Sequence, residues 1–189
     1  MILLLLFLYS YLIGSFPTAY LLVELFKKKN ILRLGDGNNG AYNVLKVTKN
    51  LGITSIVLLI DAFKGALVAL TYSYFENSNT AVLVALSGLL LGHDYSIWLN
   101  FKGGKGLASA FGAMLILAPE FVIITSVLYL LALFLVRKAE LAGLIITPVL
   151  LALMFILRPS LLLPAFITGL LICLKDIIKL LNRKKVSIF

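Results

Sequence analysis

Long apolar runs, broken by short polar stretches, cover nearly the whole chain. The pattern predicts seven apolar helical segments, over residues 2–26, 51–75, 81–99, 106–118, 121–136, 140–157 and 160–181. A helix over either of the first two would be about 37 Å long, enough to cross a hydrocarbon core of roughly 30 Å. The fourth segment, which ends before Pro119, would reach only about 20 Å. We therefore expect a short or broken helix there, of the kind that lines a cavity inside a membrane protein.

The composition supports a membrane location. Hydrophobic residues make up 61% of the 189 residues, whereas soluble domains contain roughly 45–50%. A soluble domain of this length has too little interior to bury so much apolar surface. Because no internal repeat or linker divides the chain, we predict a single domain over residues 1–189. The predicted fold class is an all-α, polytopic integral membrane protein.

The positive charges indicate how the predicted helices cross the membrane. If seven helices start from an outer N-terminus, one face receives the 27–50 loop, the 100–105 loop, the turn at Arg137 and the C-terminal tail. These regions hold every lysine and arginine except Lys64 and Arg158. The positive-inside rule makes that face cytoplasmic. The charge pattern therefore predicts seven membrane helices, with the N-terminus outside and the C-terminus in the cytoplasm.

Two glycine-rich loops fall on this predicted cytoplasmic face, over Leu34–Asn43 and Phe101–Gly106. Glycines let backbone N–H groups turn toward a ligand, and the lysines of the second loop add full positive charges. The second loop lacks the spacing of a nucleotide-binding P-loop, because position 99 is leucine and no serine or threonine follows Lys105. Each loop alone is also compatible with a solvated turn. Together they predict a site for phosphate groups.

Three other features could carry either chemistry or structure. His93 is the only histidine and ends the third segment, where it could act as a general base, contact a substrate or support the fold. Asp61 and Lys64 lie one helical turn apart inside the second segment. An internal salt bridge and a direct catalytic role are both open for them. Gly14 and Pro17 predict a kink or a close helix approach in the first segment.

Five motifs in order resemble one known family, the bacterial acyl-phosphate:glycerol-3-phosphate acyltransferases of the PlsY type. The motifs are Gly14-Ser15 with Pro17, Gly35 to Asn43, Asp61 to Gly65, Leu91-Gly92-His93, and Phe101 to Gly106 with Ala108. The resemblance covers roughly residues 10–112. It implies seven membrane helices in the cytoplasmic membrane of a bacterium, with the active site on the cytoplasmic side.

The resemblance also implies transfer of a fatty acyl group from acyl phosphate to the 1-hydroxyl of sn-glycerol 3-phosphate, a step of phospholipid synthesis. The products would be lysophosphatidate and phosphate. No cofactor, metal or nucleic acid is expected. The partners would be these two substrates, the lipid bilayer and, functionally, an enzyme that forms acyl phosphate.

The residues present suit that chemistry. Because acyl phosphate is already an activated anhydride, an enzyme needs mainly to position two anions and stabilise the developing oxyanion. We expect His93, Lys105 and Asn43 to be the catalytic residues. The residues expected to bind phosphate are Gly35, Gly37, Asn38, Gly40, Lys46, Lys102, Gly103, Gly104 and Gly106.

The chain also departs from the family pattern. Asp36 stands where the family has serine, Tyr42 replaces a threonine, and Lys46 replaces an arginine; further on, Glu140 replaces a serine and Ile177 an asparagine. A carboxylate about 4 Å from a phosphate charge would meet roughly 4 kcal/mol of repulsion at an effective dielectric near 20. Asp36 must therefore turn away, be protonated, pair with a lysine or belong to a changed site. Two alternatives stay open, a divergent relative with another acceptor or no activity, and a transporter of a small phosphorylated anion.

Overall fold

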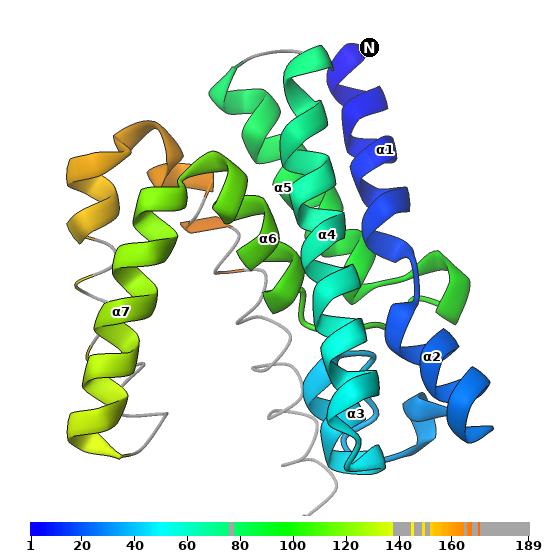
Figure 1. The fold of residues 1–189 in the computed structure, drawn as a ribbon. Coiled ribbons are helices and arrows are strands. Elements are labelled where there is room, and N and C mark those ends of the chain that lie inside the picture. The colour runs from blue at the N-terminus through cyan, green and yellow to red at the C-terminus, as the bar shows by residue number, and fades with distance from the viewer. Residues whose placement is uncertain are drawn as a thin grey trace, which may run out of the picture.

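The computed structural model describes residues 1–75, 78–137 and 152–164, together with positions 145, 149, 166, 167 and 170. Over these residues every regular element is helical, which confirms the predicted all-α class (Figure 1). The elements are α1 (Ile2–Ser15), α2 (Thr18–Lys27), η1 (Ile31–Arg33), α3 (Ala41–Thr48), α4 (Leu51–Phe75), α5 (Asn79–Asp94), η2 (Ile97–Leu99), α6 (Leu107–Leu117) and α7 (Pro119–Val136).

Within the described residues, four stretches are long and apolar enough to cross a membrane. They are Ile2–Lys27, Leu51–Tyr72, Asn79–Leu99 and Pro119–Val136. α6 is apolar but shorter, with 11 residues, as predicted for the fourth segment. Most of the sixth and seventh predicted segments, including Glu140 and Ile177, lies outside the described residues. The total of seven helices and the orientation of the termini therefore stay predictions.

The first predicted segment is interrupted at Phe16 and Pro17, which separate α1 from α2. A buried ion pair on α4 forms hydrogen bonds to residues on both sides of this break. Lys64 Nζ donates to Asp61 Oδ1 and to the carbonyl oxygen of Phe16, both at 2.6 Å. Thr18 Oγ1 donates to the same Asp61 oxygen at 2.9 Å. The pair therefore binds the backbone at the break between the two helices, which is a structural contact for two charges inside a predicted span.

Glycines allow the helices of the bundle to pack backbone against backbone. On α1 and α5, a Cβ at Gly14 would meet the carbonyl of Leu89, and one at Gly92 would meet the carbonyl of Tyr11. On α4 and α6, a Cβ at Gly65 would collide with the carbonyl oxygen of Ser109. Such close approaches stabilise helix pairs in a membrane, where lipid competes for apolar contacts.

We expect Gly65→Leu to lower the free energy of unfolding by about 3 kcal/mol, because the new side chain would push α4 from the backbone of α6. Thermal unfolding of the purified protein in detergent would measure the loss. Ser55→Leu is the matched control, since Ser55 is exposed on the same helix. Equal stability of the two variants would show that the close approach of α4 and α6 contributes little.

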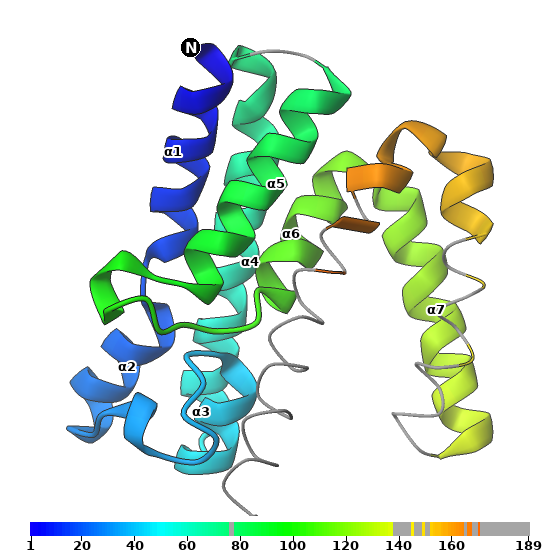
Figure 2. The same ribbon diagram turned by 180° about the vertical axis from the view of Figure 1, so that it is seen from behind.

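A small second core positions the polar end of the bundle. Ala19, Val23, Ile31, Val44 and Val57 are fully buried and join α2, η1, α3 and the first half of α4. Figures 1 and 2 place α2, α3 and the segment between α5 and α6 toward the end of the bundle opposite the N-terminus. Both glycine-rich loops therefore meet at one end of the molecule.

Candidate active site

Asn43, on the first turn of α3, shapes the first glycine-rich loop. Its side chain is fully buried. Asn43 Nδ2 donates to the carbonyls of Leu34 at 3.0 Å and Asn38 at 2.9 Å, while Oδ1 accepts from the amide of Asp36 at 3.1 Å. Gly35 has φ +61° and packs directly against Asn43 Oδ1. Both polar atoms of the Asn43 side chain therefore bind the loop, and the catalytic role expected for this residue stays a prediction.

A backbone hydrogen bond joins the two glycine-rich loops, and further bonds tie each loop to a helix. The amide of Asn39 donates to the carbonyl of Gly103 at 3.3 Å, and Asn39 Oδ1 accepts from the amide of Tyr20 at 2.7 Å. The amide of Gly104 donates to the carbonyl of His93 at 2.9 Å. The structure thus brings together two loops that lie some sixty residues apart in the sequence.

His93 lies between the second loop and α6. It is buried at the end of α5, and its Nδ1 is 3.4 Å from Ser109 Oγ. A Cβ at Gly104 would collide with His93 Nε2, and a Cβ at Gly103 would collide with the His93 carbonyl. These two glycines are therefore needed for close packing on His93. Nδ1 thus lies near Ser109 and Nε2 lies against Gly104, and the catalytic role expected for His93 stays a prediction.

A cavity of about 350 Å³ opens beside these loops. It is lined by Asp36, Asn38, Gly40, Ala41, Tyr42, Leu58, Asp61, His93, Lys105, Gly106, Leu107 and Ala108. Its polar residues come from the two loops, α4 and the end of α5. Leu58, Leu107 and Tyr42 are well exposed, and they give the cavity an apolar side that faces out of the bundle.

Only part of the predicted site lines this cavity. Asn38, Gly40, His93, Lys105 and Gly106 do so. The predicted residues that do not line it are Gly35, Gly37, Asn43, Lys46, Lys102, Gly103 and Gly104. Of these, Lys46 is exposed near the end of α3, and Lys102 lines a different cavity.

Several lining residues were not in the predicted set. Asp36 and Tyr42 stand out in the sequence as departures from the family pattern, so their positions carried a signal. Leu58 lies three residues before Asp61, on the same helical face, and that spacing could have indicated it. Nothing in the sequence singled out Leu107, the first residue of α6.

The cavity combines features that suit a phosphate group and a polyhydroxyl. Lys105 supplies a cation, and the N-terminus of α6, from Leu107, supplies backbone N–H groups without acceptors inside the helix. Gly106 has φ +69° at the N-cap of this helix. Asn38 Oδ1 is buried with no hydrogen-bond partner among the described residues, so it can accept from a substrate hydroxyl. Within the same part of the chain, no cluster of three or more His, Cys, Asp or Glu side chains could hold a metal ion.

The chain matches a family described as glycerol-3-phosphate acyltransferase over residues 4–183. The glycerol-3-phosphate acyltransferase of Mesorhizobium japonicum is 39% identical over 155 residues, which cover 80% of this chain and 77% of that protein. The corresponding protein of Sulfurimonas denitrificans is 36% identical over 179 residues, which cover 90% and 87% of the two chains.

Solved structures agree with the sequence relatives. The glycerol 3-phosphate form of PlsY (YgiH), an integral membrane glycerol 3-phosphate acyltransferase, superposes with a TM-score of 0.77 at 28% identity. The match covers 95% of this chain and 92% of that one. A second crystal structure, the lysophosphatidic acid form, gives a TM-score of 0.73 with the same coverage. The chain belongs to the glycerol-3-phosphate acyltransferase family.

Proposed function

We propose that the 350 Å³ cavity is where this membrane acyltransferase moves a fatty acyl group from acyl phosphate to the 1-hydroxyl of sn-glycerol 3-phosphate. Acyl transfer to glycerol 3-phosphate, in phospholipid synthesis, is the activity of the family. The observation that supports the site is the meeting of Lys105, the N-terminus of α6 and the buried Asn38 oxygen in one cavity with an apolar side.

In this proposal the donor lies with its phosphate against Lys105 and the first amides of α6. Both groups favour negative charge, one as a cation and the other through the helix dipole. The acyl chain extends along Leu58 and Leu107 toward the lipid. Burying the chain in the bilayer avoids the cost of leaving its methylene groups in water, about 0.8 kcal/mol for each.

The acceptor lies on the side of the first loop. Asn38 Oδ1 accepts a hydrogen bond from a glycerol hydroxyl, and Asp36 lies beside it as a second acceptor. A carboxylate at position 36 suits hydroxyl groups and repels phosphate, so it orients the acceptor with its phosphate away from the first loop. This placement gives the departure at Asp36 a role compatible with acyl transfer.

The 1-hydroxyl oxygen then attacks the carbonyl carbon of the donor. The carbon–oxygen bond to phosphate breaks, and phosphate leaves with the electron pair. The proton of the hydroxyl passes to the leaving phosphate. We assign the proton to phosphate because both nitrogens of His93 face Gly104 and Ser109. His93 and Asn43 position the two loops, and Lys105 stabilises the negative charge that develops.

The proposal extends to topology and partners. The site would face the cytoplasm of a bacterium, with seven helices and an outer N-terminus, because almost all the positive charge falls on that face. An enzyme that forms acyl phosphate would supply the donor. Family membership favours this reading over the transporter of a small phosphorylated anion.

The test is acyl transfer by the purified full-length protein in detergent. Acyl phosphate and labelled glycerol 3-phosphate are expected to give lysophosphatidate and phosphate in equal amounts, whereas an acyl thioester should give neither. Phosphate release without lysophosphatidate would indicate another acceptor or water. Absence of both products from well-folded protein, with several acyl chain lengths, would favour a relative that has lost the activity.

A further inference from the structure

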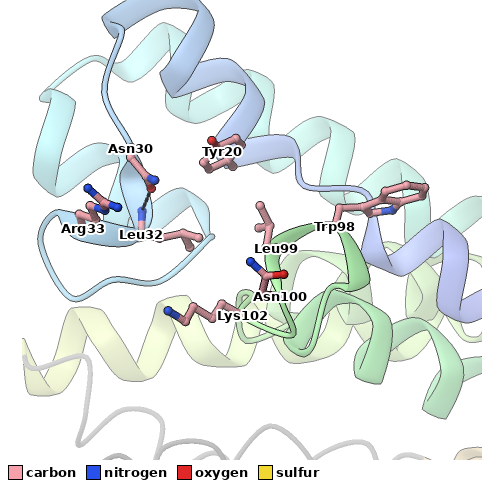
Figure 3. Close-up of a pocket in the computed structure, with 8 residues that line it drawn as sticks. All are labelled: Tyr20, Asn30, Leu32, Arg33, Trp98, Leu99, Asn100 and Lys102. Atoms are coloured by element: carbon pink, nitrogen blue, oxygen red, sulfur yellow. Dashed lines mark hydrogen bonds between the residues drawn. The ribbon is translucent and has the colours of Figure 1, made fainter.

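A second cavity, of about 290 Å³, lies beside the segment that precedes Lys105. It shares no lining residue with the first cavity. Its walls come from the region after α2 and from η2 with the residues that follow. Figure 3 shows Asn30 and Arg33 on one wall, facing Asn100 and Lys102 on the other. Two segments far apart in the sequence, η1 and the region of η2, thus carry polar side chains to one place.

Two cations reach this cavity from different parts of the chain. Arg33 ends η1, and Lys102 belongs to the second glycine-rich loop. In Figure 3 the side chains of Arg33 and Lys102 lie on different sides of the cavity. No aspartate or glutamate is among the described residues that line the cavity. Two cations at the walls of one cavity, without a carboxylate in the lining, create a positive potential that favours an anion there.

Neutral donors complete the polar lining. Asn30 Oδ1 accepts from the amide of Leu32 at 3.0 Å, so the NH₂ group of Asn30 is the part left for a ligand. Asn100 and Tyr20 also line the cavity. An arginine fork with surrounding amide donors matches the three or four oxygens of a phosphate group.

The backbone of the second wall is held in an uncommon conformation. Asn100 and Phe101 have φ values of +52° and +59°, in the left-handed region that a bulky residue rarely adopts. The amide of Phe101 donates to the carbonyl of Ser96 at 2.9 Å, and that of Lys102 to the carbonyl of Leu99 at 3.1 Å. These bonds fix the turn that sends Asn100 and Lys102 to the cavity.

We infer that this cavity is a second anion site, which binds a phosphate monoester or diester apart from the transfer site. The phosphate could belong to an anionic lipid headgroup or to a small soluble molecule. Trp98 at the edge of the cavity is 64% exposed and the neighbouring Phe101 is 62% exposed. Exposed aromatic side chains near the loop between two predicted spans are typical of the membrane–water interface. This location favours a lipid headgroup over a small soluble phosphate as the ligand.

Trp98 provides the measurement, because it is the only tryptophan in the chain and it lines this cavity. The full-length protein in phosphatidylcholine nanodiscs would be titrated with inorganic phosphate. Separate nanodiscs would contain increasing fractions of phosphatidylglycerol. We expect a saturable change in Trp98 emission. A response to phosphatidylglycerol alone would assign the site to a lipid headgroup, and a response to phosphate as well would assign it to small phosphates.

Variants separate this cavity from the first one. Arg33→Gln and Lys102→Gln are each expected to weaken the apparent affinity about tenfold, the effect of losing one charge-assisted hydrogen bond. Lys29→Gln, which removes an exposed cation near η1, and Lys105→Ala, in the first cavity, should leave the Trp98 response unchanged.

Three results would overturn the inference. The first is no saturable Trp98 response to either probe in folded protein. The second is an affinity in Arg33→Gln and Lys102→Gln equal to that of the parent protein. The third is a response that Lys105→Ala abolishes while Arg33→Gln keeps it, which would assign the binding to the transfer site. The inference does not depend on acyl transfer, so a negative result in the transferase assay would not contradict it.

Discussion

Replacement of Lys105 by alanine is expected to lower the rate of acyl transfer by about a hundredfold or more, the usual effect of removing one group that stabilises developing charge. Lys105 is the only lysine or arginine among the described residues that line the first cavity. Asp36 lines the same cavity. Without Lys105, a phosphate in this cavity would lose its cation while Asp36 remains, and repulsion between two such charges about 4 Å apart costs roughly 4 kcal/mol.

The measurement compares lysophosphatidate formation by Lys105→Ala, Lys105→Arg and Lys29→Ala at equal amounts of folded protein. Lys105→Arg keeps the charge but not the compact shape of an ammonium, so an intermediate rate is expected. Lys29→Ala removes an exposed cation from the same predicted face and should retain the rate of the parent protein. A rate for Lys105→Ala close to that of Lys29→Ala would show that the first cavity is not the transfer site.

The helical architecture was largely predictable from the sequence. Apolar runs located the helices, Pro17 and Gly14 marked the interruption of the first, and the short run before Pro119 predicted the short α6. These features depend on periodicity and on proline, which act locally. The charge pattern predicted that the two glycine-rich loops fall on one face, and the hydrogen bond between Asn39 and Gly103 joins them in the structure.

The roles inside the loops were not predictable in the same way. Lys102 and Lys105 are three residues apart, yet they line different cavities. Their separation depends on the left-handed backbone at Asn100 and Phe101, which directs the chain before Gly103. Asparagine tolerates that conformation but phenylalanine does not favour it. The residue types therefore did not predict a left-handed turn at this position.

Glycine was the least informative residue type in the site. A glycine-rich loop predicts backbone amides available to a ligand, and Gly106 adopts a left-handed conformation at the start of α6. Gly103 and Gly104 are instead glycine because His93 leaves no space for a Cβ. The same sequence pattern therefore serves a left-handed turn at Gly106 and close packing at its neighbours.

The buried ion pair of Asp61 and Lys64 leads to the second large prediction. We expect Lys64→Met to lower the free energy of unfolding by about 3–5 kcal/mol, because it leaves a buried carboxylate without its counter-ion. The change also removes the donor to the Phe16 carbonyl at the break between α1 and α2. Thermal unfolding of the purified protein in detergent would measure the loss.

Adding Asp61→Asn to Lys64→Met separates stability from catalysis. Thr18 Oγ1 donates to Asp61 at 2.9 Å in the present structure, and the new amide oxygen can still accept this hydrogen bond. The double variant has no buried carboxylate without a counter-ion, the stranded charge of Lys64→Met. The double variant should therefore recover much of the lost stability and keep transfer within about tenfold of the parent rate, since one neutral hydrogen bond contributes about 1 kcal/mol. No recovery would mean that the stranded charge is not the source of the loss. Absence of transfer from a stable double variant would place Asp61 in the reaction itself, because this residue also lines the first cavity.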